Sequence, residues 1–563
     1  MSADAPAPHT VPPPHTVDET DAPRKEVILY AAGNIENAIS NQFFSVINLL
    51  MVVAMGISPL LIGLVMSIKT IWDGITDPVM AYITDNTRSR WGRRRPYILV
   101  GGVTRILFLL AVVAFFPRTG LLKTNAELEA QKQAVAAATA GASSNTLAAA
   151  AAPTGMVALA AASNTAARTA AAPVMPKKKP GMLASIVEGI KAFRDPANAA
   201  QRKVIVYMLF VALIFTTLTT VMSVPYYALG IELSPSYNGR TQVVTYRSVI
   251  DKIAGLVAPW VAPFCFLTIF TTALEGLTWV AVFTALIGVP CLVLMVIFVR
   301  ERTHVTVQKK GKLKMGLFKS IWYTMKNVHF LKIFALHQFI GFTNGLFAQI
   351  GTFLNIYWVM GSAKSGTAMG AKVGMLAWAL GFLSLPLLNW ACRRFQKHNT
   401  LRFAVIWMSI GCMMKWWCMN PKHPEYQYVL PFFFSIGIGS VYAVLSTMMA
   451  DVTDIDELNT GTRREGMFGA VMAFLTKTVG SLTPVAAGAV LVLSGFDASL
   501  EVQTPQTILN MRLMFSFVPG VMLLLSLLLL WRYPLTAERM AEIKSELRRR
   551  RAAAAAEDAA LPA

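Results

Sequence analysis

Acidic side chains inside an apolar segment are the residues of this sequence best placed to do chemistry. Asp73 and Asp77 lie within IWDGITDPVM, and Asp85 follows in AYITDN. A carboxylate deep in a bilayer costs about 3 kcal/mol, so it persists where it binds something or is paired. Asp73 and Asp77 are four residues apart and share one helix face. Gly74 and Pro78 weaken the backbone ladder beside them, which could free carbonyl groups for a site.

A lysine in a second apolar segment is a candidate partner for these carboxylates. Lys477 lies in the middle of AFLTKTVGS. Two carboxylates one turn apart repel each other, so without a cation one is protonated or paired with a lysine. A Na⁺ ion with oxygen ligands, or a proton, would relieve the same repulsion. If cation and lysine exchange places, binding can bias a conformational equilibrium; a purely structural ion pair is the alternative.

Composition indicates a polytopic membrane protein. The chain has 563 residues, of which 55% are hydrophobic, and a mean hydropathy of +0.51. The net charge of +21 comes from basic clusters between apolar segments, which indicates membrane topology rather than nucleic-acid binding. We find no Walker-type phosphate loop, no nucleophile–base set and no metal-ligand spacing, so we expect neither an ATP-driven pump nor an enzyme, and no cofactor.

A window of about 19 residues predicts twelve membrane spans. If both termini are cytoplasmic, the loops on the inside include the basic stretches Arg88–Arg95 and Arg300–Lys319. The short loops on the outside then carry few arginine or lysine residues. We therefore expect an integral protein of a bacterial inner membrane with both termini in the cytoplasm. The spans are 27–55, 58–85, 96–116, 203–230, 243–270, 275–299, 329–359, 368–390, 400–419, 427–450, 465–494 and 511–532.

The spans divide into two halves of six. The loop after the second span, RSRWGRRRP, has a degraded counterpart, CRRFQKHNT, after the eighth. Pseudo-symmetric halves are typical of secondary carriers. An alanine-rich tract, Ala134–Val174, lies in a long outside loop, and Pro180–Asn198 resembles a surface helix. The predicted regions are a disordered cytoplasmic tail at 1–26, an N-terminal bundle at 27–299 with an extracytoplasmic insert at 117–202, a basic cytoplasmic linker at 300–328, a C-terminal bundle at 329–533 and a cytoplasmic tail at 534–563.

Three blocks together resemble the melibiose-permease type of glycoside–pentoside–hexuronide:cation symporters, within the major facilitator superfamily. The first is WD-x-x-x-DP followed by D-x-T-R-S-R-W-G-R-R-R-P; the others are PYYAL…E…R…YR and AD…D…G-x-R-R-E-G. The resemblance covers about 27–116 and 203–533. It implies an all-α membrane protein of twelve transmembrane helices in two pseudo-symmetric six-helix bundles.

The resemblance also implies roles for individual residues. Asp73 and Asp77 match the coupling-cation carboxylates, where Na⁺ is a possible ligand, Thr220 shares their site, and Lys477 matches the coupling lysine. The substrate-facing positions are Asn37, Ser223, Tyr227, Arg247 and Tyr442. The gating residues are Asp85, Arg88, Arg93, Arg240, Asp451, Asp454, Arg463 and Arg464.

Two departures affect the substrate. The melibiose carrier uses carboxylates in its first and fourth helices to bind sugar hydroxyls, and Ala38 and Ser223 occupy those places here. Glu36 or Asn37 could partly replace the first. Galactoside specificity is therefore not expected from these positions.

The sequence predicts secondary active symport of a sugar or glycoside with Na⁺ or H⁺, by alternating access, in a monomer. A uronide or a lipid-like amphiphile on the same fold is the alternative, and a non-transporting sensor is a third hypothesis. A sugar carrier would have a cavity lined by polar residues such as Asn37, Asn41, Gln42 and Arg247, whereas an amphiphile carrier would have an apolar lateral cleft. Beyond the substrate and membrane lipid we expect no partner, and no nucleic acid.

Overall fold

The computed structural model describes most of the chain and is helical there, without strands among the described residues. It describes residues 21–130 except 88 and 118, residues 195 and 198–301 except 235, residues 322–530 except 462, 463 and 501, and residues 537–560. The greater part of the predicted N-terminal tail, the alanine-rich tract, nearly all of 180–198 and the centre of the basic linker lie outside these ranges.

In the described part of the N-terminal half, four spans are single long helices and two, the first and the fifth, are broken. α1 begins three residues before the first predicted span, and α7 begins four residues before the fourth. The elements are α1 (Arg24–Ala32), α2 (Ile35–Val53), α3 (Pro59–Asn86), α4 (Arg95–Ala114), α7 (Ala199–Glu232), α8 (Tyr237–Val257), η2 (Ala258–Trp260), α9 (Val261–Cys265) and α10 (Ala273–Phe298).

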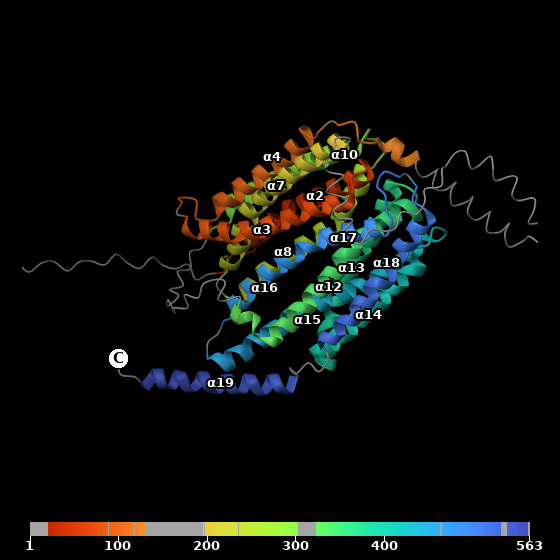
Figure 1. Ribbon diagram of the computed structural model, residues 1–563. Coiled ribbons are helices and arrows are strands. Elements are labelled where there is room, and N and C mark those ends of the chain that lie inside the picture. Colours follow the sequence, from red (N-terminus) through yellow and green to blue (C-terminus); the bar gives the residue numbers. More distant parts are fainter. Residues whose placement is uncertain are drawn as a thin grey trace, which may run out of the picture.

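The C-terminal half repeats this plan, and a further helix, α19, lies across one end of it (Figure 1). The elements are α12 (Val328–Leu354), η3 (Asn355–Val359), α13 (Ala363–Phe395), α14 (Lys397–Cys418), η4 (Pro424–Val429), α15 (Leu430–Thr460), α16 (Glu465–Gly480), α17 (Leu482–Leu493), α18 (Pro505–Ser526), η5 (Leu527–Leu530) and α19 (Ala537–Ala560).

Each predicted span coincides with a helix or with consecutive helices. Within the described ranges, eight of these units are long and apolar enough to cross a membrane by length and composition. The other four predicted spans coincide with α1–α2, α12, α14 and α15, which mix polar residues into the apolar sequence. In α2, for example, Glu36 and the amide side chains of Asn37, Asn41 and Gln42 interrupt the apolar sequence. These polar positions lower the hydropathy of a span and are also where a site can form.

Local sequence explains where helices break. The first predicted span divides at Gly33 and Asn34, and the fifth divides near Pro259, where a helix interior would lose a hydrogen bond. In contrast, α3 runs without a break through Gly74 and Pro78. The expected weakening of the helix beside the carboxylates therefore does not become a break.

The two halves share an apolar core at one end only. One cluster of buried side chains contains Phe43 and Ile57 from the N-terminal half together with Phe347 and Phe353 from the C-terminal half. Two other clusters stay within a single half, one around Tyr30 and the other a set that includes Phe330 and Met448. We call the shared-core end the joined end. Burial of shared apolar surface holds the halves together there.

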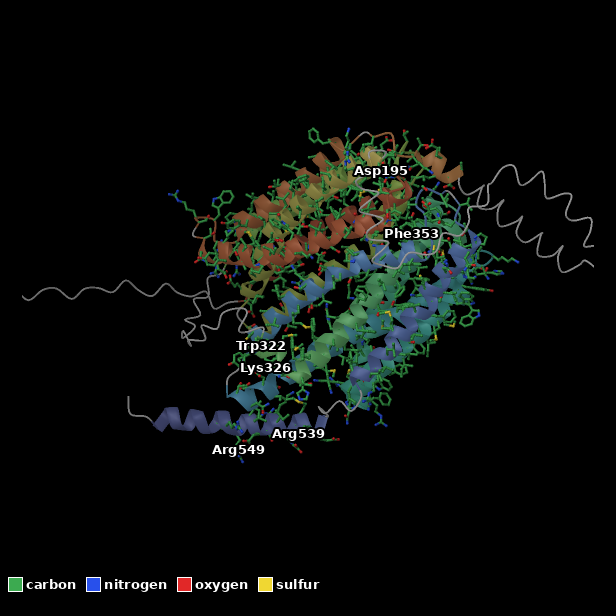
Figure 2. The ribbon with its side chains drawn as sticks, viewed as in Figure 1. Asp195, Trp322, Lys326, Phe353, Arg539 and Arg549 are labelled. Carbon is green, nitrogen blue, oxygen red and sulfur yellow. The ribbon has the colours of Figure 1, made fainter. Side chains whose placement is uncertain are left out.

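The opposite end, which we call the basic end, carries the arginine-rich loops and α19. Figure 1 shows the halves diverging toward α19. In Figure 2, Trp322 and Lys326 lie toward α19, where Arg539 and Arg549 are marked, whereas Phe353 lies toward the joined end. The shared apolar core thus lies at the joined end, whereas the described ion pairs of the basic end stay within one half.

Close backbone contact between α3 and α17 makes the joined end tight. A Cβ atom added at Gly63 would lie 2.4 Å from the carbonyl oxygen of Pro484, and one at Gly488 would lie 2.5 Å from that of Pro59. The Ser67 hydroxyl donates a hydrogen bond to the Ser481 carbonyl nearby. Small residues allow membrane helices to approach in this way.

We predict that Gly63→Ala and Gly488→Ala each lower the thermal unfolding midpoint of the purified protein in detergent. An added methyl group would meet backbone, and overpacking of this kind costs about 1–3 kcal/mol. Gly381→Ala is the matched control, because no atom lies within 4 Å of the added Cβ. Equal midpoints for all three variants would contradict the proposed tight contact.

Candidate functional site

The two carboxylates of α3 meet a lysine from the other half. The ammonium group of Lys477, on α16, lies 2.7 Å from Asp73 Oδ2 and also contacts Asp77 Oδ2. α3 belongs to the N-terminal half and α16 to the C-terminal half. One lysine therefore joins both carboxylates across the interface between the halves.

A threonine binds the other oxygen of each carboxylate. Thr220 Oγ1, on α7, lies 3.4 Å from Asp73 Oδ1 and 3.1 Å from Asp77 Oδ1. Thr220 Oγ1 also lies 3.1 Å from Thr76 Oγ1. The hydroxyls and carboxylates form a cluster of oxygen atoms of the kind that binds a hard cation. The structure thus brings together the four residues expected to form the coupling site.

This cluster is accessible from the space between the halves. The side chains of Asp73, Asp77 and Lys477 are 29%, 34% and 31% exposed, respectively. Lys69, one turn before Asp73, lies 5.6 Å from the ring of Phe44 and was not identified from the sequence. Lys477 compensates one of the two negative charges, and a monovalent cation would supply the same single positive charge in its place.

A second set of polar side chains lies within the N-terminal half. The Arg247 guanidinium lies 5.0 Å from the centre of the Tyr227 ring, and its Nε lies 3.9 Å from Asp251 Oδ2. The Asn34 amide donates to Asp251, and the Asn37 amide donates to Asn34 Oδ1 at 3.3 Å. Three predicted substrate positions, Asn37, Tyr227 and Arg247, therefore belong to one connected network.

A buried ion pair holds this network in place. Arg105, on α4, pairs with Glu36, on α2, and both side chains are fully buried. Arg105 Nη1 also donates to Asn37 Oδ1 at 3.0 Å. The suggestion that Glu36 replaces a sugar-binding carboxylate is therefore wrong for this conformation, because Arg105 and Ser40 occupy its oxygens. The arginine inside the third apolar span was the sequence signal for this pair.

The remaining two predicted substrate positions form no hydrogen bond with the network among the described residues. Ser223 is half-buried on α7, one turn before Tyr227. Tyr442, on α15 in the other half, lies 5.0 Å from the ring of His337. A substrate touching both tyrosines would have to span the space between the halves.

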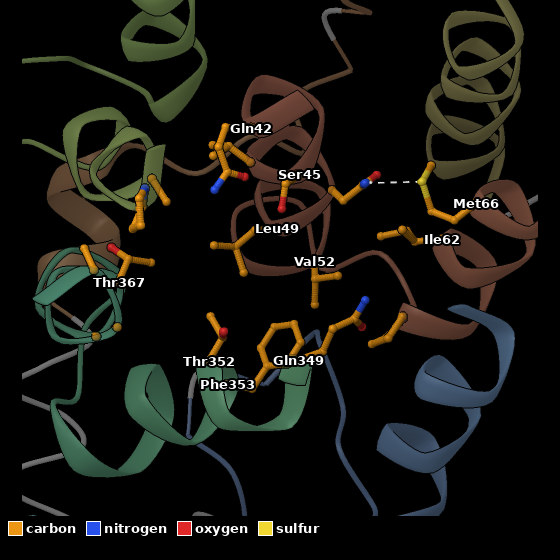
Figure 3. A pocket seen from close by; sticks show the side chains of 18 of the residues that line it. Gln42, Ser45, Leu49, Val52, Ile62, Met66, Gln349, Thr352, Phe353 and Thr367 are labelled. Atoms are coloured by element: carbon orange, nitrogen blue, oxygen red, sulfur yellow. Dashed lines mark hydrogen bonds between the residues drawn. The ribbon is translucent and has the colours of Figure 1, made fainter. Parts of the chain in front are cut away.

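A cavity lined by both polar and apolar residues lies between the halves toward the joined end (Figure 3). Its volume is about 310 Å³, within the range of small-molecule sites. Gln42 and Ser45 of α2 face Gln349 and Thr352 of α12 across it. Of the polar residues expected to line a sugar cavity, Gln42 does so, whereas Asn37, Asn41 and Arg247 lie outside this cavity. Met66 of α3, two turns before Asp73, forms part of its wall.

Ion pairs at the basic end stay within each half. In the N-terminal half, Glu232 binds Arg93 at 2.5 Å and Arg94 at 2.6 Å, and Asp85 lies 3.5 Å from Arg94. Glu301 approaches Arg93 at 3.4 Å. Gly92 lies beside Glu301 with φ +94°, where a side chain would be strained and would collide with that carboxylate.

The second half has a corresponding set with partners that the sequence did not predict. Asp451 binds Lys397 at 2.6 Å and lies 3.6 Å from Lys544 of α19. Arg464 binds Asp456 at 2.5 Å.

Four of the predicted gating residues take no part in these described ion pairs. Asp454 forms no ion pair with another described residue. Arg88 and Arg463 lie outside the described residues, and only the backbone of Arg240, in α8, is described.

A second lysine joins the halves on the opposite flank. Lys252, on α8, lies 4.7 Å from the centre of the Phe382 ring and 5.7 Å from that of Trp378, both on α13. Lys252 was not identified from the sequence, because its partners are aromatic residues that lie far along the chain. The two flanks thus differ chemically: α3 and α16 meet through an ion pair, and α8 and α13 through cation–π contacts.

Comparisons with known proteins agree with this architecture. The family model described as "MFS/sugar transport protein" matches residues 29–162 and 193–537. An uncharacterized symporter from Synechocystis sp. is 26% identical, with 93% of this chain and 96% of that protein covered. A putative glycoside/cation symporter from Escherichia coli is 21% identical, with 88% and 89% covered.

Solved structures extend the comparison to the fold. The crystal structure of a D-xylose–proton symporter covers 90% of this chain and 96% of that chain, with a TM-score of 0.53 and 10% identity. This level of identity supports the fold alone. The family model spans both halves and the helices that carry Asp73, Asp77, Thr220 and Lys477. The chain therefore belongs to the MFS/sugar transport protein family of the major facilitator superfamily.

Proposed function

We propose that the chain moves a sugar or glycoside across the membrane together with Na⁺ or H⁺, and that Asp73 and Asp77 bind the cation. The observation that carries this proposal is the convergence of both carboxylates on Lys477 from the other half. A charged carboxylate inside a membrane span is energetically unfavourable and is retained where it binds a ligand or is paired. Here they have a partner that a cation can replace.

Exchange between Lys477 and the cation provides the coupling. In this structure the lysine neutralises one of two negative charges and draws α16 toward α3. A cation bound among Asp73, Asp77 and Thr220 supplies the same charge without joining the halves. A ligand shifts a conformational equilibrium only when its affinity differs between the two conformations. Here the cation removes the contact between Lys477 and α3, which stabilises one arrangement of the halves, and this difference is the source of coupling.

The orientation follows from the distribution of positive charge. The basic end carries Arg93–Arg95 and the arginines of α19, and positively charged loops favour the cytoplasm. The proposal therefore places both termini in the cytoplasm, in a bacterial inner membrane. The described conformation, closed at the joined end, is then open toward the cytoplasm and closed toward the outside.

The network around Arg247 suits a polyhydroxylated substrate. Arg247 and the amides of Asn34 and Asn37 offer donors, and Tyr227, 41% exposed, offers a ring face. Sugar sites combine such donors with aromatic rings that pack on CH groups. The cavity that contains Gln42 lies farther toward the closed joined end and provides further polar groups.

A uronide is the second candidate substrate. Arg247 Nε lies 3.9 Å from Asp251 and has no hydrogen-bond partner among the described residues, so a sugar carboxylate could form a closer bidentate pair with the guanidinium. The amphiphile alternative requires an apolar opening into the cavity between the halves. The residues that line this cavity include Gln42, Ser45, Asn48, Gln349, Thr352 and Thr367 beside apolar residues such as Leu49, Val52 and Phe353, so it offers hydrogen bonds to a sugar as well as apolar surface.

We predict that Asp73→Asn and Asp77→Asn each abolish gradient-driven accumulation in proteoliposomes supplied with glycosides, pentosides and uronides. Each substitution removes one charge that the cation must neutralise, so transport without coupling can only equilibrate the substrate. The measurement is uptake of labelled substrate under imposed Na⁺ or proton gradients. Asp497→Asn, at the joined end, is the charge-matched control and retains accumulation. Normal accumulation by both α3 variants would refute the assignment of the cation site.

We predict that Tyr227→Leu raises the KM for the transported sugar with little change in protein stability. The ring packs on Arg247, contacts the Tyr226 ring at 5.5 Å and remains 41% exposed, so its loss removes substrate contacts and a partly exposed cation–π contact worth about 0.5–1 kcal/mol. Tyr428→Leu is the matched control, since that side chain is 39% exposed at the opposite end of the molecule. An unchanged KM for Tyr227→Leu would exclude this ring from the substrate site.

A further inference from the structure

A large apolar cavity lies on the C-terminal half, away from the space between the halves. Its volume is about 840 Å³. The wall is formed by the last turns of α13, including Leu387 and Trp390, and by the first half of α14, including Phe403 and Trp407. Phe432 of α15 closes the far side.

Aromatic rings form most of the deep part of this cavity. Trp407 stacks on Phe403 with ring centres 5.9 Å apart and meets the edge of Phe432 at 5.5 Å. The Trp407 indole N–H donates to the Phe432 carbonyl at 3.5 Å, so its polar atom is already partnered. The side chains of Trp390, Phe403 and Phe432 remain 57%, 61% and 48% exposed. The structure therefore presents an exposed aromatic surface that suits an apolar group.

The mouth of the cavity at the basic end is positively charged. Arg394 forms part of the wall, and Arg393 lies beside it with Trp390 in an adjoining hollow. Both arginines are exposed, and no described carboxylate pairs with either. α14 begins at this point, and its N-cap residue, Gln396, provides no side-chain cap for the first amide groups. The positive end of a 22-residue helix adds to the field of the arginines.

The backbone is held in an unusual shape at the same point. Gln396 has φ +67° and ψ 155°, and it is the only non-glycine residue in the described ranges with a positive φ. This strained residue and Asn399 line the mouth together with Arg394. The tight turn brings the end of α13 and the start of α14 together, so Arg394 of α13 and Asn399, in the first turn of α14, line one opening.

This cavity is distinct from the proposed transport route. It shares no lining residue with the cavity between the halves, and the residues of α13 that line the two cavities lie at opposite ends of that helix. The described wall contains no acidic residue. Its ligand therefore combines a long apolar part with an anionic head, and has no need to be transported.

We propose that this cavity binds one phospholipid with an anionic headgroup. The phosphate lies at Arg394 and the first amides of α14, and an acyl chain runs along Phe403, Trp407 and Phe432. The charge at the mouth selects the lipid, because each basic residue near the surface attracts anionic lipid by about 1 kcal/mol. A bound lipid would hold the ends of α13 and α14 together, and α14 carries Lys397, the partner of Asp451.

The test is native mass spectrometry of the full-length protein in detergent, titrated with phosphatidylglycerol or phosphatidylcholine of identical acyl chains. The wild-type protein is expected to bind one phosphatidylglycerol at least about 5-fold more tightly than phosphatidylcholine, the ratio that corresponds to about 1 kcal/mol. Arg394→Gln is expected to remove this preference. Arg90→Gln, an exposed arginine of the basic end in the other half, is the charge-matched control and retains it.

A second variant tests the apolar part of the site. Ala391→Phe adds a ring to a small residue of the cavity wall and is expected to weaken binding of both lipids, with the thermal unfolding midpoint as the folding control. Equal affinities of the wild-type protein for the two lipids would overturn the proposal, as would equal effects of Arg394→Gln and Arg90→Gln. A stable dimer that dissociates in Ala391→Phe would assign the cavity to a second copy of this chain. All of these outcomes are independent of the transported substrate.

Discussion

The ion pair between Lys477 and the two carboxylates of α3 is the interaction on which this structure depends. Asp73 and Asp77 share one helix face, and two adjacent negative charges in a membrane require a positive partner. The partner comes from the other half of the molecule, so the charge balance of the site depends on how the halves are arranged. A mobile cation can satisfy the same carboxylates without that dependence. This difference links ion binding to conformation.

Other ion pairs join helices within each half, whereas a separate and smaller set of contacts joins the two halves to each other. Glu36 and Arg105 join α2 to α4 inside the N-terminal half, where an unpaired charge would be very unfavourable. Ion pairs at the basic end, such as Arg94 with Glu232 and Lys397 with Asp451, also stay within one half. The halves are held to each other by the apolar core and the glycine contacts of the joined end, by Lys477 on one flank and by Lys252 on the other.

The sequence predicted the elements that can be recognised from residue order alone, without knowledge of tertiary contacts. Long apolar runs define the spans, and charged residues inside them, such as Asp73, Asp77 and Lys477, stand out because the membrane disfavours them. Thr220 came from the family resemblance, since a threonine in an apolar helix carries no such signal. Pairings were harder to predict, because the partner of a charge depends on tertiary contacts. Arg105 with Glu36 and Lys397 with Asp451 are examples.

Cation binding to Lys477→Gln is the measurement that tests the central claim most directly. Calorimetric titration of the purified protein with Na⁺, and proton uptake in weakly buffered solution, would compare this variant with the wild type and with Lys252→Gln. If Lys477 competes with the cation for Asp73 and Asp77, its removal leaves two uncompensated carboxylates, and the variant binds the coupling cation more tightly than either other protein. Unchanged or weaker binding by Lys477→Gln would contradict exchange between lysine and cation, and would leave the lysine with a structural role alone.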